Sequence, residues 1–269
     1  MTALARIRAG FKGALLVCAA LGAGASVVMA GELPKNEEGL RELVRVRTAE
    51  IASRPDDGQL YMDRAEAYFI FGKFDEAVND ATTALSLDDG LDLAYYVRGL
   101  ALGRMKRIKA GIADLTVYLE RHPDKSLALT KRGVRYLWID DLKNAEKDLA
   151  RAVEIDPNNA EAYDDLGVVY AKTGRVDKAV KSFLETIRLD NSYAKAYHNL
   201  ALSYALSGNY GQALKFSEID VKMSPQSKSA LFLKAEILRS LGRLDEALEA
   251  SDDAEFLPDG NWSENISVK

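Results

Sequence analysis

Apolar residues recur along most of the chain at the three-to-four-residue spacing of one face of a helix. In the segment 160–193, Tyr163, Leu166 and Tyr170 fall on one side of a first predicted helix. Ala179 and Phe183 fall on one side of a second predicted helix after a short break. Each helix has one apolar stripe, so the pattern predicts pairs of amphipathic helices that pack against each other.

The same pattern returns every 34 residues, with starts at residues 58, 92, 126, 160, 194 and 228. Positions 8 and 20 of each copy are small, which allows two helix axes to approach closely. The small residues are Ala65, Gly99, Gly133, Gly167, Ala201 and Ala235 at position 8, and Ala77, Gly111, Ala145, Ala179, Ala213 and Ala247 at position 20. Glycine stands at position 15 in four copies, where the first helix is expected to end.

These six copies in register resemble the tetratricopeptide repeat family. The resemblance implies an all-α fold, a right-handed superhelical solenoid of six helix-turn-helix repeats with an N-terminal capping helix. We expect a signal peptide at 1–30, the capping helix within 31–57, repeats at 58–91, 92–125, 126–159, 160–193, 194–227 and 228–257, and a C-terminal tail at 258–269. A single helix pair cannot bury both faces, so the stacked array is the folding unit.

Residues 1–30 have the pattern of a secretory leader. Arg6, Arg8 and Lys12 precede an uncharged stretch that is rich in Ala and Gly and ends at Ala30. This pattern predicts cleavage after Ala30 and a periplasmic or secreted protein. The alternative is a protein anchored to the membrane by residues 13–30, an apolar run just long enough to cross it.

The composition excludes several classes of function. The net charge of −5 disfavours a nucleic-acid partner, and a single cysteine, Cys18, excludes an intramolecular disulfide framework. Two histidines far apart in sequence, His122 and His198, offer no metal site. We expect His122 to be exposed in a turn. With no catalytic motif visible, the sequence predicts no enzyme, no cofactor and no small-molecule substrate.

Arginine at position 7 and aspartate at position 23 occur together in repeats 1–3 and are both absent from repeats 4–6. The residues are Arg64, Arg98 and Arg132, with Asp80, Asp114 and Asp148. We therefore expect ion pairs, either within one repeat or across to the next, as between Asp80 and Arg98. The alternative is that these are exposed charges that recur by chance.

The resemblance also implies that the first helix of each repeat lines a groove that binds a peptide. Carried over by position, the predicted groove residues are Met62, Tyr96, Leu100, Lys131, Val134, Trp138, Asp164, Asp165, Lys195, His198 and Asn199. We expect a basic group of the ligand near Asp164 and Asp165. In the alternative, the apolar residues pack only against neighbouring helices, and the two aspartates form a solvated face.

The function that the sequence predicts is a protein-protein interaction adaptor or assembly factor of the cell envelope, with a protein or peptide partner. The alternative is a membrane-anchored scaffold that forms a homodimer through its open C-terminal repeat. Trp262 of the tail either folds back onto that repeat or is loose.

Overall fold

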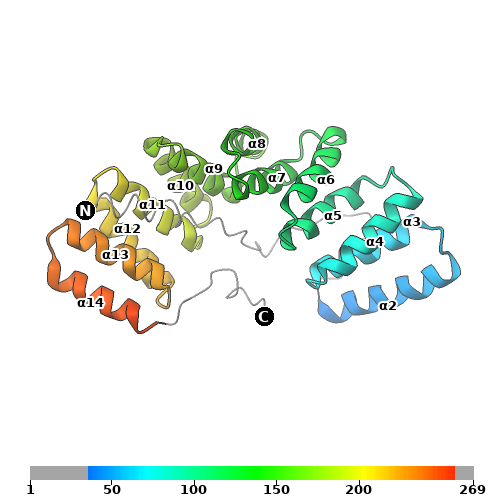
Figure 1. Ribbon diagram of the computed structural model, residues 1–269, viewed down its shortest axis with the longest axis horizontal. Coiled ribbons are helices and arrows are strands. Elements are labelled where there is room, and N and C mark those ends of the chain that lie inside the picture. The colour runs from blue at the N-terminus through cyan, green and yellow to red at the C-terminus, as the bar shows by residue number, and fades with distance from the viewer. Residues whose placement is uncertain (1–35, 258–269) are drawn as a thin grey trace. The chain divides into compact units, whose positions relative to one another are not determined.

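The computed structural model describes residues 36–257, and these residues form thirteen α-helices and no strand (Figure 1). The predicted signal peptide, the tail and Trp262 lie outside them. The helices are α2 (Glu37–Ser53), α3 (Gly58–Ile70), α4 (Phe74–Leu87), α5 (Asp92–Arg104), α6 (Ile108–Arg121), α7 (Ser126–Trp138), α8 (Leu142–Ile155), α9 (Ala160–Lys172), α10 (Val176–Leu189), α11 (Ala194–Leu206), α12 (Tyr210–Met223), α13 (Lys228–Ser240) and α14 (Leu244–Glu255).

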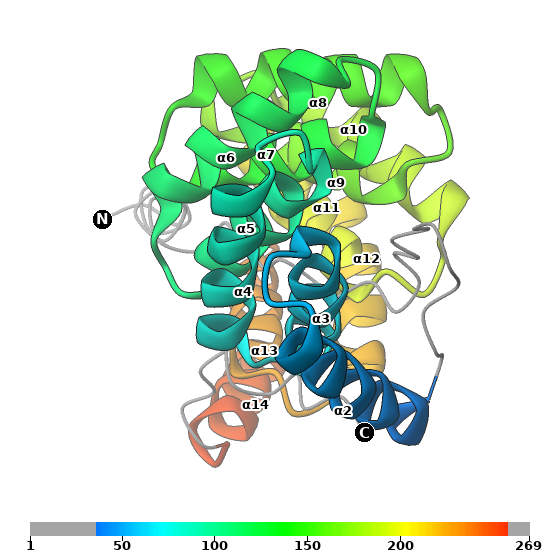
Figure 2. The ribbon, with the colours of Figure 1, turned by 90° about the vertical axis from the view of Figure 1, so that its right-hand side faces the viewer.

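The described chain divides into two compact units, an N-terminal unit of residues 36–155 and a C-terminal unit of residues 156–257. Within each unit, every helix packs on the next one in the chain, and each first helix also contacts the first helix of the following hairpin. In the N-terminal unit α2 covers α3, as Figure 2 shows from the side. The all-α fold of stacked helical hairpins with an N-terminal capping helix is therefore confirmed.

The first helices of the six hairpins begin at the residues where the 34-residue period starts each repeat. The turn after each first helix contains a residue with positive φ at position 15. Four of these are glycine, but Lys106 and Asp140 adopt φ of 61° and 59° in repeats 2 and 3. Packing of the two helices thus imposes a left-handed turn even where the local sequence disfavours it.

Small residues at positions 8 and 20 set how closely two helices of a hairpin approach. Repeat 2 has glycine at both positions, and a Cβ added to Gly111 would lie 2.8 Å from the carbonyl oxygen of Gly99. A methyl group cannot fit beside this backbone atom, so α5 and α6 would have to separate.

We therefore expect Gly111→Ala to lower the free energy of unfolding by about 1–3 kcal/mol, as overpacking of a core does. Gly211 on α12 is the control, because a Cβ added there meets no atom within 4 Å. Gly211→Ala should stabilise the chain by up to about 1 kcal/mol through helix propensity. Urea denaturation of both variants tests this, and a Gly111→Ala variant as stable as the parent would contradict it.

The arginines at position 7 pair with the aspartates of their own repeat. Each guanidinium donates two hydrogen bonds to the carboxylate, with Nε–Oδ2 distances of 2.6–2.7 Å and Nη2–Oδ1 distances of 2.8 Å. The alternative pairing of Asp80 with Arg98 is wrong, because the carboxylate of Asp80, on the second helix of repeat 1, lies against Arg64 on the first helix of the same repeat.

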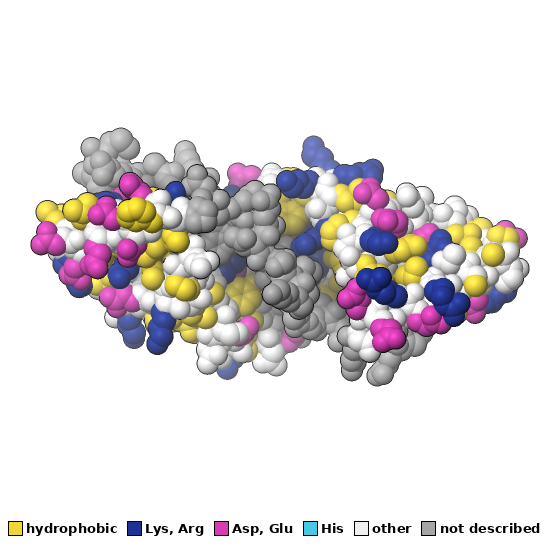
Figure 3. Space-filling model, turned by 90° about the horizontal axis from the view of Figure 1, so that it is seen from below, with side chains coloured by type: hydrophobic (Ala, Val, Ile, Leu, Met, Phe, Trp, Pro, Cys, Tyr) yellow, Lys and Arg dark blue, Asp and Glu magenta, His cyan; other side chains and the backbone are white. Residues whose placement is uncertain are grey.

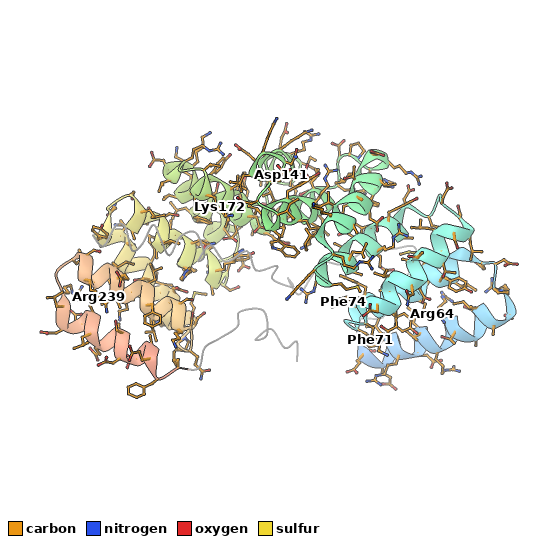
Figure 4. The ribbon with its side chains drawn as sticks, viewed as in Figure 1. Arg64, Phe71, Phe74, Asp141, Lys172 and Arg239 are labelled. Atoms are coloured by element: carbon orange, nitrogen blue, oxygen red, sulfur yellow. The ribbon has the colours of Figure 1, made fainter. Side chains whose placement is uncertain are left out.

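A threonine on the preceding helix completes each pair. The Nη1 groups of Arg64, Arg98 and Arg132 donate to threonine hydroxyls of the helix before, at 3.0, 3.3 and 3.2 Å. We call each set an Arg–Asp–Thr clasp; the three clasps are Arg64–Asp80–Thr48, Arg98–Asp114–Thr82 and Arg132–Asp148–Thr116. Arg64 is labelled in Figure 4. Each clasp therefore joins one hairpin to the helix that precedes it.

No helix within residues 36–257 has the length and apolar content that crossing a membrane requires. Over the same residues, no group of three His, Cys, Asp or Glu side chains is arranged to hold a metal ion.

Candidate binding site on the first helices

The C-terminal unit brings four of the predicted groove residues together. Asp164 and Asp165 lie on α9, which begins after the N-cap Asn159, whose side chain accepts a hydrogen bond from the Ala162 amide. Lys195 and Asn199 lie four residues apart on α11 and therefore share one helix face. Because α9 contacts α11, the four side chains meet. We call them the aspartate–asparagine cluster.

The cluster is buried and held by polar contacts. Lys195 Nζ lies 2.7 Å from Asp164 Oδ2 and 3.4 Å from Asp165 Oδ1. Asn199 donates from Nδ2 to Asp164 Oδ1 at 3.3 Å. Both aspartates are buried, so the alternative that they form a solvated face is wrong. They are buried because a lysine of the next first helix compensates their charge.

One acceptor in this cluster has no partner. Asn199 is 1% exposed, and its Oδ1 makes no hydrogen bond. Its Nδ2 is used by Asp164, and this bond fixes the orientation of the amide. An unsatisfied buried carbonyl costs free energy that an incoming N–H donor would recover. The nearby Tyr193 hydroxyl stays neutral, because burial and then the charge of Asp164 raise its pKa.

His198 is next to Asn199 in sequence, but its side chain contacts α12 rather than the aspartate–asparagine cluster. Its Nδ1 lies 2.7 Å from Oδ2 of Asp220 on α12, and both side chains are buried. His198 therefore joins the two helices of its own hairpin. His122 is half-buried rather than exposed in its turn, so that prediction is wrong. Its ring packs on Tyr118 and its Nε2 lies 2.8 Å from Asp92.

The predicted groove residues of the N-terminal unit are mostly buried. Met62, Tyr96, Leu100 and Val134 are all less than 9% exposed, and Met62 belongs to a core cluster with Ala65 and Val97. The Tyr96 ring packs on Tyr118, with centroids 5.0 Å apart. Their role in ligand binding stays a prediction.

Lys131 and Trp138 on α7 are half-buried. Between them lies an arginine that the repeat pattern does not single out as a site residue. Arg135 is buried and donates from Nη2 to the carbonyl oxygens of Gly99 and Leu100 on α5. Its guanidinium also lies over the Trp138 ring, 5.9 Å from the centroid. The signal in the sequence was Gly103 on α5. Only glycine leaves room there for the Arg135 guanidinium, since a Cβ at residue 103 would lie 2.3 Å from it.

A second missed residue is Glu66 on α3. It occupies position 9, where Leu100, Val134 and Val168 stand in the next three repeats. It is 3% exposed, and its Oε1 has no hydrogen-bond partner. Burial, with a smaller contribution from the charge of Asp63, raises its pKa to about 8. An acid at a position that is Leu or Val in repeats 2–5 was the signal available in the sequence.

Three models of one repeat family match the chain. A TPR repeat model matches residues 169–208, and two tetratricopeptide repeat models match residues 149–181 and 198–261. The chain is a tetratricopeptide repeat protein. Proteins of this family generally act as non-enzymatic scaffolds that bind other proteins.

Solved tetratricopeptide repeat structures share the fold. YrrB, described as a TPR protein with an unusual peptide-binding site, is 24% identical, with 70% of this chain and 97% of YrrB covered and a TM-score of 0.60. PilF of Pseudomonas aeruginosa is 16% identical, with coverage of 74% and 90% and a TM-score of 0.63. MamA of Desulfovibrio magneticus RS-1 is 19% identical, with coverage of 64% and 97% and a TM-score of 0.59.

A curated relative matches a short part of the tetratricopeptide repeat chain. The SGT1 homolog of Oryza sativa subsp. japonica is 37% identical over 68 residues, which are 25% of this chain. The match spans 18% of that relative.

Proposed function

We propose that this tetratricopeptide repeat protein is a non-enzymatic adaptor or assembly factor of the cell envelope. It binds an extended segment of a partner polypeptide on the first helices of the C-terminal unit. The observation that carries this proposal is the buried, unpartnered Oδ1 of Asn199 beside Asp164. A peptide backbone supplies N–H donors along its whole length, and such a donor satisfies Oδ1.

The charge of the aspartate–asparagine cluster supports a basic side chain in the bound segment. Two carboxylates and one ammonium group meet there in a buried setting. A lysine or arginine of the ligand adds a second cation, and charge-assisted hydrogen bonds are stronger than neutral ones. The peptide-binding site named for YrrB agrees with this use of the fold.

The location in the envelope rests on the leader pattern of residues 1–30, which supports export and cleavage after Ala30. Residues 13–30 as a membrane anchor are the alternative. N-terminal sequencing of the exported chain separates the two, since cleavage leaves Gly31 as the first residue.

Selection of a phage-displayed library of random 12-residue peptides on the full chain tests the binding function. We expect the recovered peptides to be enriched in Lys and Arg, and Asn199→Leu to weaken their binding about tenfold through loss of one buried acceptor. Asn79→Leu, the same change at an exposed position of α4, is the matched control and should leave binding unchanged. Fluorescence anisotropy of labelled peptides measures both.

A second variant keeps the test valid if Asn199→Leu lowers stability. Asp164→Asn retains a hydrogen-bonding side chain but removes one negative charge, so it should reduce the preference for basic peptides. Recovered peptides that bind both variants as tightly as they bind the parent would overturn the proposed site.

A further inference from the structure

The last helix, α14, exposes an apolar strip. Leu244 and Leu248 lie one turn apart and are 66% and 60% exposed, and Phe256 follows the helix and is also exposed. Such a strip on the surface of a soluble protein marks an interaction site more often than scattered single residues do.

The repeats show what this strip is built to receive. Leu244 and Leu248 occupy positions 17 and 21 of the last repeat, where repeat 5 has Tyr210 and Leu214 on α12. Tyr210 and Leu214 pack in one core cluster with Leu233 of the following first helix, α13. Within residues 36–257 no first helix follows α14. The place that a first helix takes against α12 is therefore open against α14.

The charges around the strip select among occupants. Helix α14 contains six acidic residues and no basic one; the acids are Asp245, Glu246, Glu249, Asp252, Asp253 and Glu255. Glu246 pairs with Arg243, and among residues 36–257 the other five form no ion pair. Figure 3 shows acidic and hydrophobic side chains together at its left end, where α13 and α14 lie.

A second copy of α14 is a poor occupant of this face. Two copies would bring their acidic residues together, and like charges placed across an interface oppose association. A basic helix would instead be attracted to this face, since its cations would meet five acids that form no ion pair within residues 36–257.

We propose that the exposed face of α14 binds an amphipathic helix of another protein, in the place of a following first helix. The bound helix has apolar residues three and four apart, which cover Leu244 and Leu248. It carries Lys or Arg on both flanks, which meet the acids of α14. This surface is separate from the aspartate–asparagine cluster and goes beyond the peptide binding proposed for it.

The test uses a fluorescein-labelled synthetic helix of 16 residues, with leucine at positions three and four apart and lysine on both flanks. The same peptide with glutamate for each lysine is the second probe. We expect the full chain to bind the lysine peptide at least ten times more tightly than the glutamate peptide, as measured by anisotropy at low salt.

Two sets of variants locate the binding. Leu244→Ser with Leu248→Ser keeps the net charge and should weaken binding of the lysine peptide at least tenfold. Leu184→Ser, at an exposed leucine of α10, should leave it unchanged. Unchanged binding to the Leu244/Leu248 double variant would overturn the proposal, because it would show that charge alone attracts the peptide.

Two further outcomes would assign the face to another occupant and also overturn the proposal. A parent chain that is dimeric by light scattering, and monomeric with both serine substitutions, would assign it to a second copy. A Trp262→Ala variant of the full chain that binds the lysine peptide when the parent does not would assign it to the chain's own tail.

Discussion

Arg132→Leu is expected to lower the free energy of unfolding by about 3–5 kcal/mol, the cost of leaving one member of a buried ion pair without its partner. The Asp148 side chain is 4% exposed, and both of its oxygens accept from Arg132. Without the guanidinium, this carboxylate stays in a low-dielectric setting with no cation, and the Thr116 hydroxyl also loses its donor.

The chain offers its own control for this change. Repeat 4 has Leu166 and Ser182 at the positions of Arg132 and Asp148. The double variant Arg132→Leu with Asp148→Ser copies that pair, removes the buried charge and should regain most of the lost stability. Urea denaturation of the parent and both variants measures this. A loss below about 0.5 kcal/mol in the single variant would mean that solvent screens the pair.

Glu66→Gln is expected to remove a pH dependence of stability. The pKa of Glu66 is about 8 in the folded chain, against 4.5 for the same side chain in the unfolded chain, so the folded state holds the proton more tightly. Its contribution to stability is fully present below pH 4.5 and is lost as pH rises toward 8. A pKa difference of one corresponds to about 1.4 kcal/mol, so the loss amounts to a few kcal/mol.

Unfolding by urea at pH 5, 7 and 9 tests this prediction. The Glu66→Gln variant should be close to the parent at pH 5 and more stable than the parent at pH 9. Glu76→Gln, which removes a charge from an exposed position of α4, should follow the parent at all three values. A parent and a Glu66→Gln variant with parallel pH profiles would show that Glu66 is ionised at little cost.

The helical hairpins were predictable because their cause is repeated six times. A 34-residue period in small and large residues specifies helix pairs and their stacking without any long-range information. The pairing of Arg64 with Asp80 was partly predictable, since the two residue types occur together. The choice between partners in the same or the next repeat depends on helix offset, which the residue types do not encode.

The candidate site was predictable in position and less so in environment. The resemblance placed Asp164 and Asn199 on facing helices, but burial of Asp164 depends on Lys195 reaching back from the next repeat. His122 was expected in water because it stands in a turn, yet an aromatic neighbour on α6 covers it. Glu66 and Arg135 depart from the repeat pattern, so the 34-residue period does not predict their burial or their contacts.

The Arg–Asp–Thr clasps make the N-terminal unit modular in length. Each arginine follows its threonine by 16 residues and precedes its aspartate by 16. Deleting residues 92–125 would bring Thr82 to the same spacing before Arg132, so the junction would find its partner again. Gene duplication or loss in steps of one repeat can thus lengthen or shorten this unit, because the arginine at each new junction again has its threonine and aspartate at the spacing that the clasp requires.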